Sequence, residues 1–307
     1  MRRLRERAVV LLACALCGCG GTSADSDAAA AAPARDAAGP APGDASFANR
    51  DGSTSSSVDT GADPPRDDAS VAESDAGAPP PPTRDCASMP VAGLLLCEDF
   101  ESGEIDSTVW TRQTEAGGTL AVETGRVHDG THALHLTLPA VDSGTALLVT
   151  RAPFPVPGNH FFGRALVWMS APLPDTHDRV LGALGILRGG TADYHLDMNR
   201  GEMNSRYRHP SITTHGGIRQ DGYFPATERW LCIEWEYDGS RNAMRYWFDG
   251  TLEPTMVVDG TESPLWEAPV FERFEIGLSH YLAPTNAARY DVYIDSVVLA
   301  TARIGCS

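Results

Sequence analysis

The stretch 193–208 holds the side chains of this chain that are best suited to proton transfer. It contains two strand-like runs, DYHLDMN at 193–199 and EMNSRYR at 202–208. Alternation along the first run puts His195 and Asp197 on one face and the apolar residues on the other. A neutral histidine can accept a proton, and an arginine such as Arg206 can neutralise a carboxylate. We therefore take His195 and Arg206 as candidate catalytic residues, with an ordinary hydrogen-bonded surface histidine as the alternative.

These residue types supply part of what β-elimination from a uronate polymer requires. That reaction needs a group that neutralises the carboxylate, a base for the C5 proton and an acid for the leaving oxygen. Tyr207, Tyr223 and Tyr281 are possible acids, although the sequence places none of them beside His195. Whether the protein is an enzyme stays open. A glycosidase is disfavoured, because no run of the sequence has carboxylates with the spacing E-x-D-x-E.

Short strand-like segments must position these residues, and they fill most of the chain from residue 94 onward. They are rich in Val, Leu, Tyr and Trp, and Gly, Pro, Asp or Asn separate them, whereas no long segment has helical periodicity. The predicted strands are 119–124, 132–138, 145–151, 161–169, 179–187, 193–199, 202–208, 229–237, 243–248, 273–281 and 291–299. A hairpin turn at 237–242 joins two of them. Such a pattern predicts an all-β sandwich of two packed antiparallel sheets.

Several of these strands carry charged and aromatic side chains on the face that points away from the core. Four of them are expected to form one concave sheet, namely 161–169, 193–199, 202–208 and 229–237. That sheet would present Arg164, Trp168, His195, Asp197, Arg206 and Glu234. Aromatic rings can stack on sugar rings, and charged groups can bind hydroxyl groups or carboxylates. The candidate substrate-binding residues are therefore Arg164, Trp168, Asp197 and Glu234.

The charge balance limits the possible partners. The formal net charge is −17, which argues against nucleic acid as a partner. All 24 basic residues are arginines, so a lysine nucleophile or Schiff base is excluded. A polyanionic ligand is compatible with this composition if arginines gather in the groove. The arginines expected there are Arg164, Arg206, Arg208, Arg219 and Arg245.

Four parts of the sequence resemble concanavalin A-like jelly-roll domains. They are CEDFESG with DSTVW, RVHDGTHALHL, RWLCIEWEYDGS with YWFDG, and YIDSVVLATARIGC at the end. They are most similar to secreted domains related to the glucuronan lyases of polysaccharide lyase family 20 and to their cellulose-induced fungal relatives. The resemblance covers 86–307 and implies a jelly-roll sandwich with a polysaccharide partner. It leaves two functions open, which are carbohydrate binding without turnover and lyase action on polyglucuronate-like chains.

The same resemblance implies a structural Ca²⁺ at the edge where the first and last strands meet. The positions that match the family pattern are Glu101, Asp129, His132 and Asp295, with His132 contributing its carbonyl oxygen. Calcium prefers six to eight hard oxygen ligands, which carboxylates and carbonyls supply. The alternative is that Glu98, Asp99 and Glu101 are solvated charges that discourage strand pairing at a sheet edge.

The N-terminus has the organisation of an export signal. Arginines precede a short apolar run, which is too short to span a bilayer, and the run ends in Leu16-Cys17-Gly18-Cys19. This box resembles that of bacterial lipoproteins and implies that Cys19 is lipidated, with Gly20 favouring the outer membrane. Cys14 and a plain secretory signal are the alternatives. We expect residues 1–19 to be the signal peptide. The protein is then exported and lies at the outer membrane or cell surface, and the lipid anchor is its only expected contact with the membrane.

The remainder divides into a linker and one domain. Residues 20–85 are dominated by Ala, Asp, Ser, Gly, Pro and Thr, a composition that predicts a disordered linker. Residues 86–307 are expected to form the jelly-roll domain, and we expect this domain to be a monomer. The domain contains Cys86, Cys97, Cys232 and Cys306, an even number that predicts two disulfides with three possible connectivities. We favour Cys86–Cys97, which closes a short loop, and Cys232–Cys306, which attaches the C-terminal tail to an inner strand.

Overall fold

The structure is a computed structural model that describes Cys86 and residues 92–211, 216–261 and 266–306. Within strand β10 it describes the backbone of 216–221 but not the side chains. The predicted signal peptide, the lipidation site Cys19 and the linker 20–85 lie outside the described residues. Among the described residues, no helix is long and apolar enough to cross a membrane.

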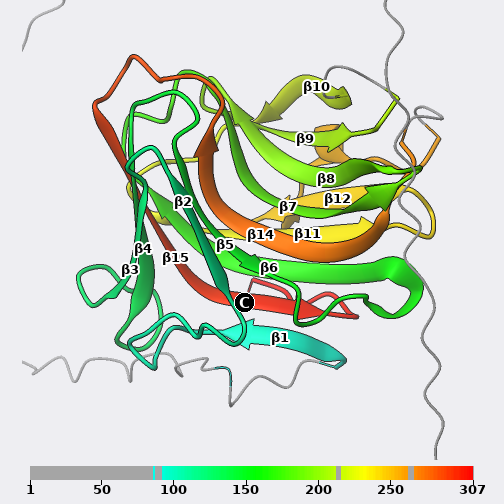
Figure 1. Cartoon of the computed structure of the whole chain (residues 1–307), viewed down its shortest axis with the longest axis horizontal. Helices are drawn as coiled ribbons and strands as arrows, with labels where there is room; N and C mark the ends of the chain where they lie inside the picture. The colour runs from blue at the N-terminus through cyan, green and yellow to red at the C-terminus, as the bar shows by residue number, and fades with distance from the viewer. Residues whose placement is uncertain (1–85, 87–91, 212–215, 262–265, 307) are drawn as a thin grey trace, which may run out of the picture. The chain divides into compact units, whose positions relative to one another are not determined.

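Two antiparallel sheets form the domain, as the sequence predicts (Figure 1). Sheet A has the strand order β13 (Thr251–Leu252), β12 (Ala243–Phe248), β11 (Trp230–Asp238), β6 (His160–Met169), β15 (Arg289–Ala300), β4 (Ala133–Pro139) and β3 (Thr119–Glu123), with β1 (Leu94–Glu98) also paired to β15. Sheet B has the order β10 (Gly216–Tyr223), β9 (Glu202–Arg208), β8 (Gly190–Asn199), β7 (His177–Leu187), β14 (Val270–His280), β5 (Thr145–Thr150) and β2 (Thr111–Glu115). The only helical turns in the described part of the chain are two short 3₁₀ turns, Pro157–Asn159 and Pro254–Met256.

The core lies between the two sheets and follows the alternation of the sequence. On β8 of sheet B, Tyr194, Leu196 and Met198 point inward. On β11 of sheet A, Trp235 and Tyr237 point inward. These rings pack edge to face, with centroids of Tyr194 and Tyr237 6.1 Å apart, while Trp235 stacks on Phe274 at 5.3 Å. The apolar faces predicted for 193–199 and 231–237 are therefore confirmed, and the opposite faces carry the charged residues of both sheets.

Both favoured disulfides are present. Cys86 is bonded to Cys97 on β1, and Cys232 on β11 is bonded to Cys306 in the C-terminal tail. The second bond holds the tail over the outward face of sheet A. Strand β1 also pairs with the last strand, β15, as the resemblance implies.

The acidic residues after β1 fix the local backbone. Glu98 accepts hydrogen bonds from the Phe100 backbone N–H and the Trp110 indole N–H, both at 2.9 Å. Asp99 accepts one from the backbone N–H of Cys86 at 2.9 Å. These two carboxylates therefore hold Cys86 and the chain leaving β1, and they are not simply solvated edge charges.

The expected grouping of four strands into one concave sheet is wrong. Strands β6 and β11 belong to sheet A, whereas β8 and β9 belong to sheet B. A period of two tells which face of a strand is buried, but it carries no information about which sheet the strand joins. The polar edge strand β2 and the short strand β13 were also not predicted, because all their residues are exposed and neither has apolar alternation.

Candidate functional site

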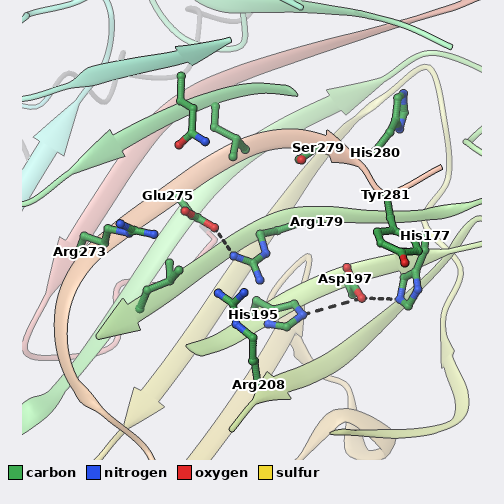
Figure 2. A pocket seen from close by; sticks show the side chains of 13 residues that line it. His177, Arg179, His195, Asp197, Arg208, Arg273, Glu275, Ser279, His280 and Tyr281 are labelled. Carbon is green, nitrogen blue, oxygen red and sulfur yellow. Dashed lines mark hydrogen bonds and ion pairs between the residues drawn. The ribbon is translucent and has the colours of Figure 1, made fainter. Parts of the chain in front are cut away.

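A groove crosses the face of sheet B that points away from the core. It is a cavity of about 290 Å³ whose walls come from six strands of that sheet, β2, β5, β7, β8, β9 and β14 (Figure 2). Its lining includes His177, Arg179, His195, Asp197, Arg208, Arg273, Glu275, Ser279 and Tyr281. Figure 1 shows β7, β8 and β14 bending along their length. The strands bend, and every second side chain points outward, so the charged residues of neighbouring strands come together on this face.

His195 lies at the bottom of this groove between two carboxylates. Its side chain is only 1% exposed, and Nδ1 is 2.6 Å from Oδ1 of Asp193. Nε2 lies 3.8 Å from Oδ2 of Asp197. Burial alone would lower the pKa of His195, but the charge of Asp193 and its hydrogen bonds to Asp193 and Asp197 raise it above the usual value. The two carboxylates therefore outweigh the effect of burial at this histidine.

His177 lies nearer the surface of the groove, on the other side of Asp197. Its Nε2 is 2.6 Å from Oδ2 of Asp197 and 2.9 Å from Nη2 of Arg206, and about a third of its side chain is exposed. Burial would raise the pKa of Asp197, but its hydrogen bonds with His177 and His195 hold it below the usual range. The predicted neighbours His195 and Arg206 are directly opposite each other in the ladder of β8 and β9. Sheet B thus brings together three of the predicted site residues, His195, Asp197 and Arg206.

A second network lies beside the first and contains two more arginines. Arg179 is paired with Glu275 and, at 3.1 Å, with Asp193. Arg208 is 2.6 Å from the same oxygen of Asp193. Burial would raise the pKa of Asp193, but Arg179, His195 and Arg208 hold it well below the usual range. The floor of the groove is therefore an ionised layer at neutral pH.

Arg273 differs from the other arginines of the groove. It is half-buried, lines the cavity, and makes no ion pair or hydrogen bond among the described residues. Figure 2 shows its side chain extending from β14 towards the cavity. Four arginines therefore lie against three carboxylates, those of Asp193, Asp197 and Glu275, which leaves one formal positive charge in surplus in a protein of net charge −17.

Tyr281 stands at the rim of the groove and is 72% exposed. Its backbone N–H donates to the carbonyl oxygen of His177 at 3.0 Å, and Figure 2 shows the two side chains next to each other. The sequence offered Tyr281 only as one of three possible acids, and it did not single out His177, Arg179 or Arg273. The signal was present in the alternation of His177 with Arg179 at the start of β7, which marks an outward polar face.

Three predicted substrate-binding residues lie elsewhere, on the outward face of sheet A, and this corrects the expectation that they share the groove. Glu234 is 1% exposed because the C-terminal tail covers it. Its carboxylate accepts hydrogen bonds from Arg303 and from the Gly305 N–H, both at 2.7 Å. Arg164 donates to the carbonyl of Gly305 at 3.4 Å under the same tail. The ring of Trp168 is covered by the guanidinium of Arg126, 3.8 Å from its centroid.

The arginines expected to cluster also divide between the sheets. Arg208 lines the groove and Arg206 contacts the lining residue His177, whereas Arg164 and Arg245 lie on sheet A, where Arg245 pairs with Glu236 at 2.5 Å. The side chain of Arg219 is outside the described part of the chain. The cations that replace them in the groove, Arg179 and Arg273, come from β7 and β14.

The four predicted metal ligands gather around the loop 128–132. Glu101 accepts hydrogen bonds from the backbone N–H groups of Thr131 and His132, at 2.8 and 2.9 Å. Asp295 accepts them from the N–H groups of His128 and Asp129, at 2.9 and 3.1 Å. Burial raises the pKa of Asp295 to about 6, and no arginine pairs with it among the described residues. Since a carboxylate has about four acceptor sites, Glu101 and Asp295 each keep acceptor sites that a hard cation could use.

Comparison with known proteins places the fold. No protein-family model matches the chain, and no curated protein matches it. Among solved structures, it is similar to a cellulose-induced protein, Cip1, with a TM-score of 0.57 and 20% identity over 69% of this chain and 100% of that one. It is also similar to an endo-β-1,4-glucuronan lyase from the fungus Trichoderma reesei, with a TM-score of 0.54 and 16% identity over 68% and 96%. A third is an alginate lyase, vAL-1, from Chlorella virus, with a TM-score of 0.50 and 13% identity over 67% and 99%. At these identities the likeness establishes the jelly-roll fold.

Proposed function

We propose that the groove of sheet B binds an acidic polysaccharide. The observation that carries this proposal is Arg273, a cation in the groove without an ion-pair partner among the described residues, in a lining that already has surplus positive charge. An arginine of this kind is suited to a carboxylate, which it can bind through two parallel hydrogen bonds. The groove crosses six strands, so it suits an extended ligand better than a compact one.

The structural neighbours support a carbohydrate as the ligand. Two of them are named as lyases of glucuronan and of alginate, and the third as a protein induced by cellulose. A fold of this kind hosts several functions, so the argument for this chain rests on its own groove. The positive lining favours a uronate polymer over a neutral glucan.

A second candidate function, β-elimination, is favoured by one further observation, the pair His177 and Tyr281 at the rim. In this scheme Arg273 binds the uronate carboxylate and so stabilises negative charge that develops at C5. His177, oriented by Asp197, accepts the C5 proton. The electrons of the C5–H bond form the C4=C5 double bond, the C4–O bond breaks, and the leaving oxygen takes the proton of the Tyr281 hydroxyl.

The groove favours His177 over His195 as the base in this scheme. His195 is buried, and its two ring nitrogens face the carboxylates of Asp193 and Asp197. An imidazole buried between two carboxylates has no ring nitrogen free to reach the C5 proton. We therefore assign His195 to positioning Asp197, and we keep Arg206 as a cation beside the same carboxylate, with its Nε 3.6 Å from Oδ2 of Asp197.

The experiment compares polyglucuronate with a neutral β-1,4-glucan, by calorimetry for binding and by ultraviolet absorbance of unsaturated uronates for turnover. We expect wild-type protein to bind polyglucuronate and not the glucan. If it also turns polyglucuronate over, the His177→Gln variant should lose about 10²- to 10⁴-fold in rate with binding retained. Binding without absorbance change supports the binding function alone, and equal binding of both polymers or of neither overturns the proposal.

We further propose that a structural Ca²⁺ is held by Glu101, Asp295 and the carbonyl oxygens of Asp129 and His132. Its support is Asp295, a buried carboxylate that has no arginine partner among the described residues and keeps acceptor sites beyond the two loop N–H groups that it already binds. Such an ion would fasten the loop 128–132 to β15 and stabilise the sheet edge.

The remaining proposal concerns the setting of the domain. We propose that Cys19 carries a lipid that tethers the monomeric domain to the outer membrane through the linker 20–85. It is supported by the sequence of the N-terminus and by the disulfides, which are typical of exported proteins. In this setting the groove would meet polysaccharide outside the cell.

A further inference from the structure

A side pocket continues the groove beyond Arg273. On β14 the lining of the groove lies between Arg273 and Tyr281, whereas the side pocket is lined by Glu272 and Arg273. The two cavities also share Leu184 on β7. The charged residues of the side pocket are Arg151, Glu272 and Arg273, and the rest of its lining is uncharged. A polymer that fills the groove to this end therefore meets two charged residues, Arg151 and Glu272, that the groove itself does not contain.

A β-bulge brings Glu272 and Arg273 to the same face of sheet B. The pairing of β14 with β7 shifts its register between Phe271 and Arg273. Phe271 and Phe274 both belong to the core, and the two residues between them both line the side pocket. Regular alternation would send one of these two into the core, so the bulge is what re-aims them.

Arg151 reaches the same place from β5. Thr150, the last residue of β5, is paired with Phe274 on β14. The next residue of each strand beyond this pair is an arginine, so Arg151 and Arg273 come to neighbouring positions. Like charges at neighbouring positions of a sheet repel each other, and a bound anion removes that repulsion.

Glu272 is the only carboxylate in the lining of the side pocket, and it holds Arg151 loosely. Nη1 of Arg151 lies 4.0 Å from Oε2 of Glu272, which is too far for a hydrogen bond. The two side chains are 61% and 48% exposed, and an ion pair in such contact with water contributes little stability. A ligand carboxylate can bind Arg151 through two parallel hydrogen bonds and replace this contact, because Glu272 can turn into the water.

We infer that Arg151 binds a second carboxylate of the acidic polysaccharide, on a different sugar from the one that Arg273 binds. This inference rests on the proposed function, because the second carboxylate is delivered by a polymer that occupies the groove. It narrows the ligand to chains whose acidic sugars lie close together, and it disfavours mainly neutral chains with isolated uronates. Glu272 then competes with the ligand for Arg151 and limits the affinity.

The test is calorimetric titration of oligoglucuronate into the wild type and into variants of both residues. Arg151→Gln should weaken binding by about threefold at about 0.05 M salt, and the loss should nearly vanish at about 0.5 M, because salt screens an exposed charge contact. Glu272→Gln should tighten binding by about twofold to threefold, since it frees Arg151 for the ligand. In the double variant Arg151→Gln/Glu272→Gln this gain should disappear. Both positions are exposed, so the variants are expected to fold, and thermal melting checks this.

The matched controls are Arg112→Gln and Glu115→Gln, two exposed positions on the edge strand β2 that line neither cavity. Both should bind like the wild type, and a loss in Arg112→Gln equal to that in Arg151→Gln overturns the inference, because binding then follows overall charge. A gain in Glu272→Gln that persists without Arg151 also overturns it. If Arg273→Gln loses affinity and Arg151→Gln does not, the inference fails and the proposed function stands.

A second probe separates a second carboxylate from any other contact of Arg151. It is the same oligomer after part of its carboxylates have been reduced to alcohols, so that neighbouring acidic sugars become rare. The loss caused by Arg151→Gln should shrink on this probe, and an unchanged loss overturns the inference. If the wild type binds neither probe, the proposed function itself fails.

Discussion

Replacing Arg273 by glutamine isolates the contribution of the groove to ligand binding. Other groove arginines are committed to carboxylates, so their removal leaves a buried charge unpaired and destabilises the fold. Arg273 has no such partner among the described residues. Glutamine keeps much of the aliphatic stem that packs on the sheet. The Arg273→Gln variant should therefore melt close to the wild type, within about 0.5 kcal/mol in the free energy of unfolding.

The expected loss of binding follows from the contact that Arg273 is positioned to make. A hydrogen bond to a charged group contributes roughly 1.5 to 3 kcal/mol. Arg273 is half-buried, so solvent screening places its contribution in the lower part of that range, about 1.5 to 2 kcal/mol. Each 1.4 kcal/mol is a factor of ten in the dissociation constant, so Arg273→Gln should weaken polyglucuronate binding by about tenfold to thirtyfold. Its remaining affinity should depend less on salt, since one charge contact is gone.

The assay is calorimetric titration of oligoglucuronate at two salt concentrations, with melting curves of every variant. The control is Arg229→Gln, because Arg229 is an exposed arginine beside β11 that pairs with Asp249, away from the groove. An unchanged dissociation constant in Arg273→Gln would refute the assignment. An equal loss in Arg229→Gln would show that binding follows overall charge and not the groove.

Three further predictions concern the pH response, the cation and the anchor. Because the pKa of His195 is raised, the stabilisation that it gives is full below its usual pKa and is lost as pH rises through the folded value. His195→Gln should therefore lower the melting temperature more at pH 6 than at alkaline pH, and an equal effect at both would contradict the raised pKa. EDTA should lower the melting temperature by about 5 to 10 °C if the Ca²⁺ concentration is about a hundred times the dissociation constant. Asp295→Ala should abolish this difference. Equal melting of the wild type with and without chelator contradicts the site. Cys19→Ala should release the protein from membranes or leave it unprocessed, and wild-type fractionation of this variant would favour Cys14 or a plain signal.

The fold was largely predictable because alternation along a strand is a local property. The runs 202–208 and 243–248 coincide with β9 and β12, and the turn at 237–242 joins β11 to β12 as expected. The inward faces followed from the same period. Polar edge strands such as β2 were missed, because a strand with both faces in water needs no apolar residue.

The site was only partly predictable because it depends on which strands become neighbours. His195, Asp197 and Arg206 lie on consecutive strands joined by a tight turn, so sequence proximity was enough to group them. Glu275 and Arg273 reach the groove because β14 pairs with β7, which is about ninety residues earlier in the chain. Nothing local in either strand specifies that pairing. The wrong assignment of Arg164 and Glu234 to the groove has the same origin. Both side chains point outward as predicted, but their strands belong to sheet A and not to sheet B.

The two outward faces of the sandwich differ in a way that points to the groove as the working surface. On sheet A the tail and the neighbouring side chains cover the charged residues, so that Glu234 meets Arg303 and Trp168 lies under Arg126. On sheet B an ionised layer faces an open cavity, with Arg273 left over. Buried ion pairs are often no more stabilising than apolar residues of similar size, so folding alone gives little reason to keep such a layer on the floor of a groove. A ligand that carries carboxylates supplies that reason, because it completes the set of partners that the protein leaves incomplete.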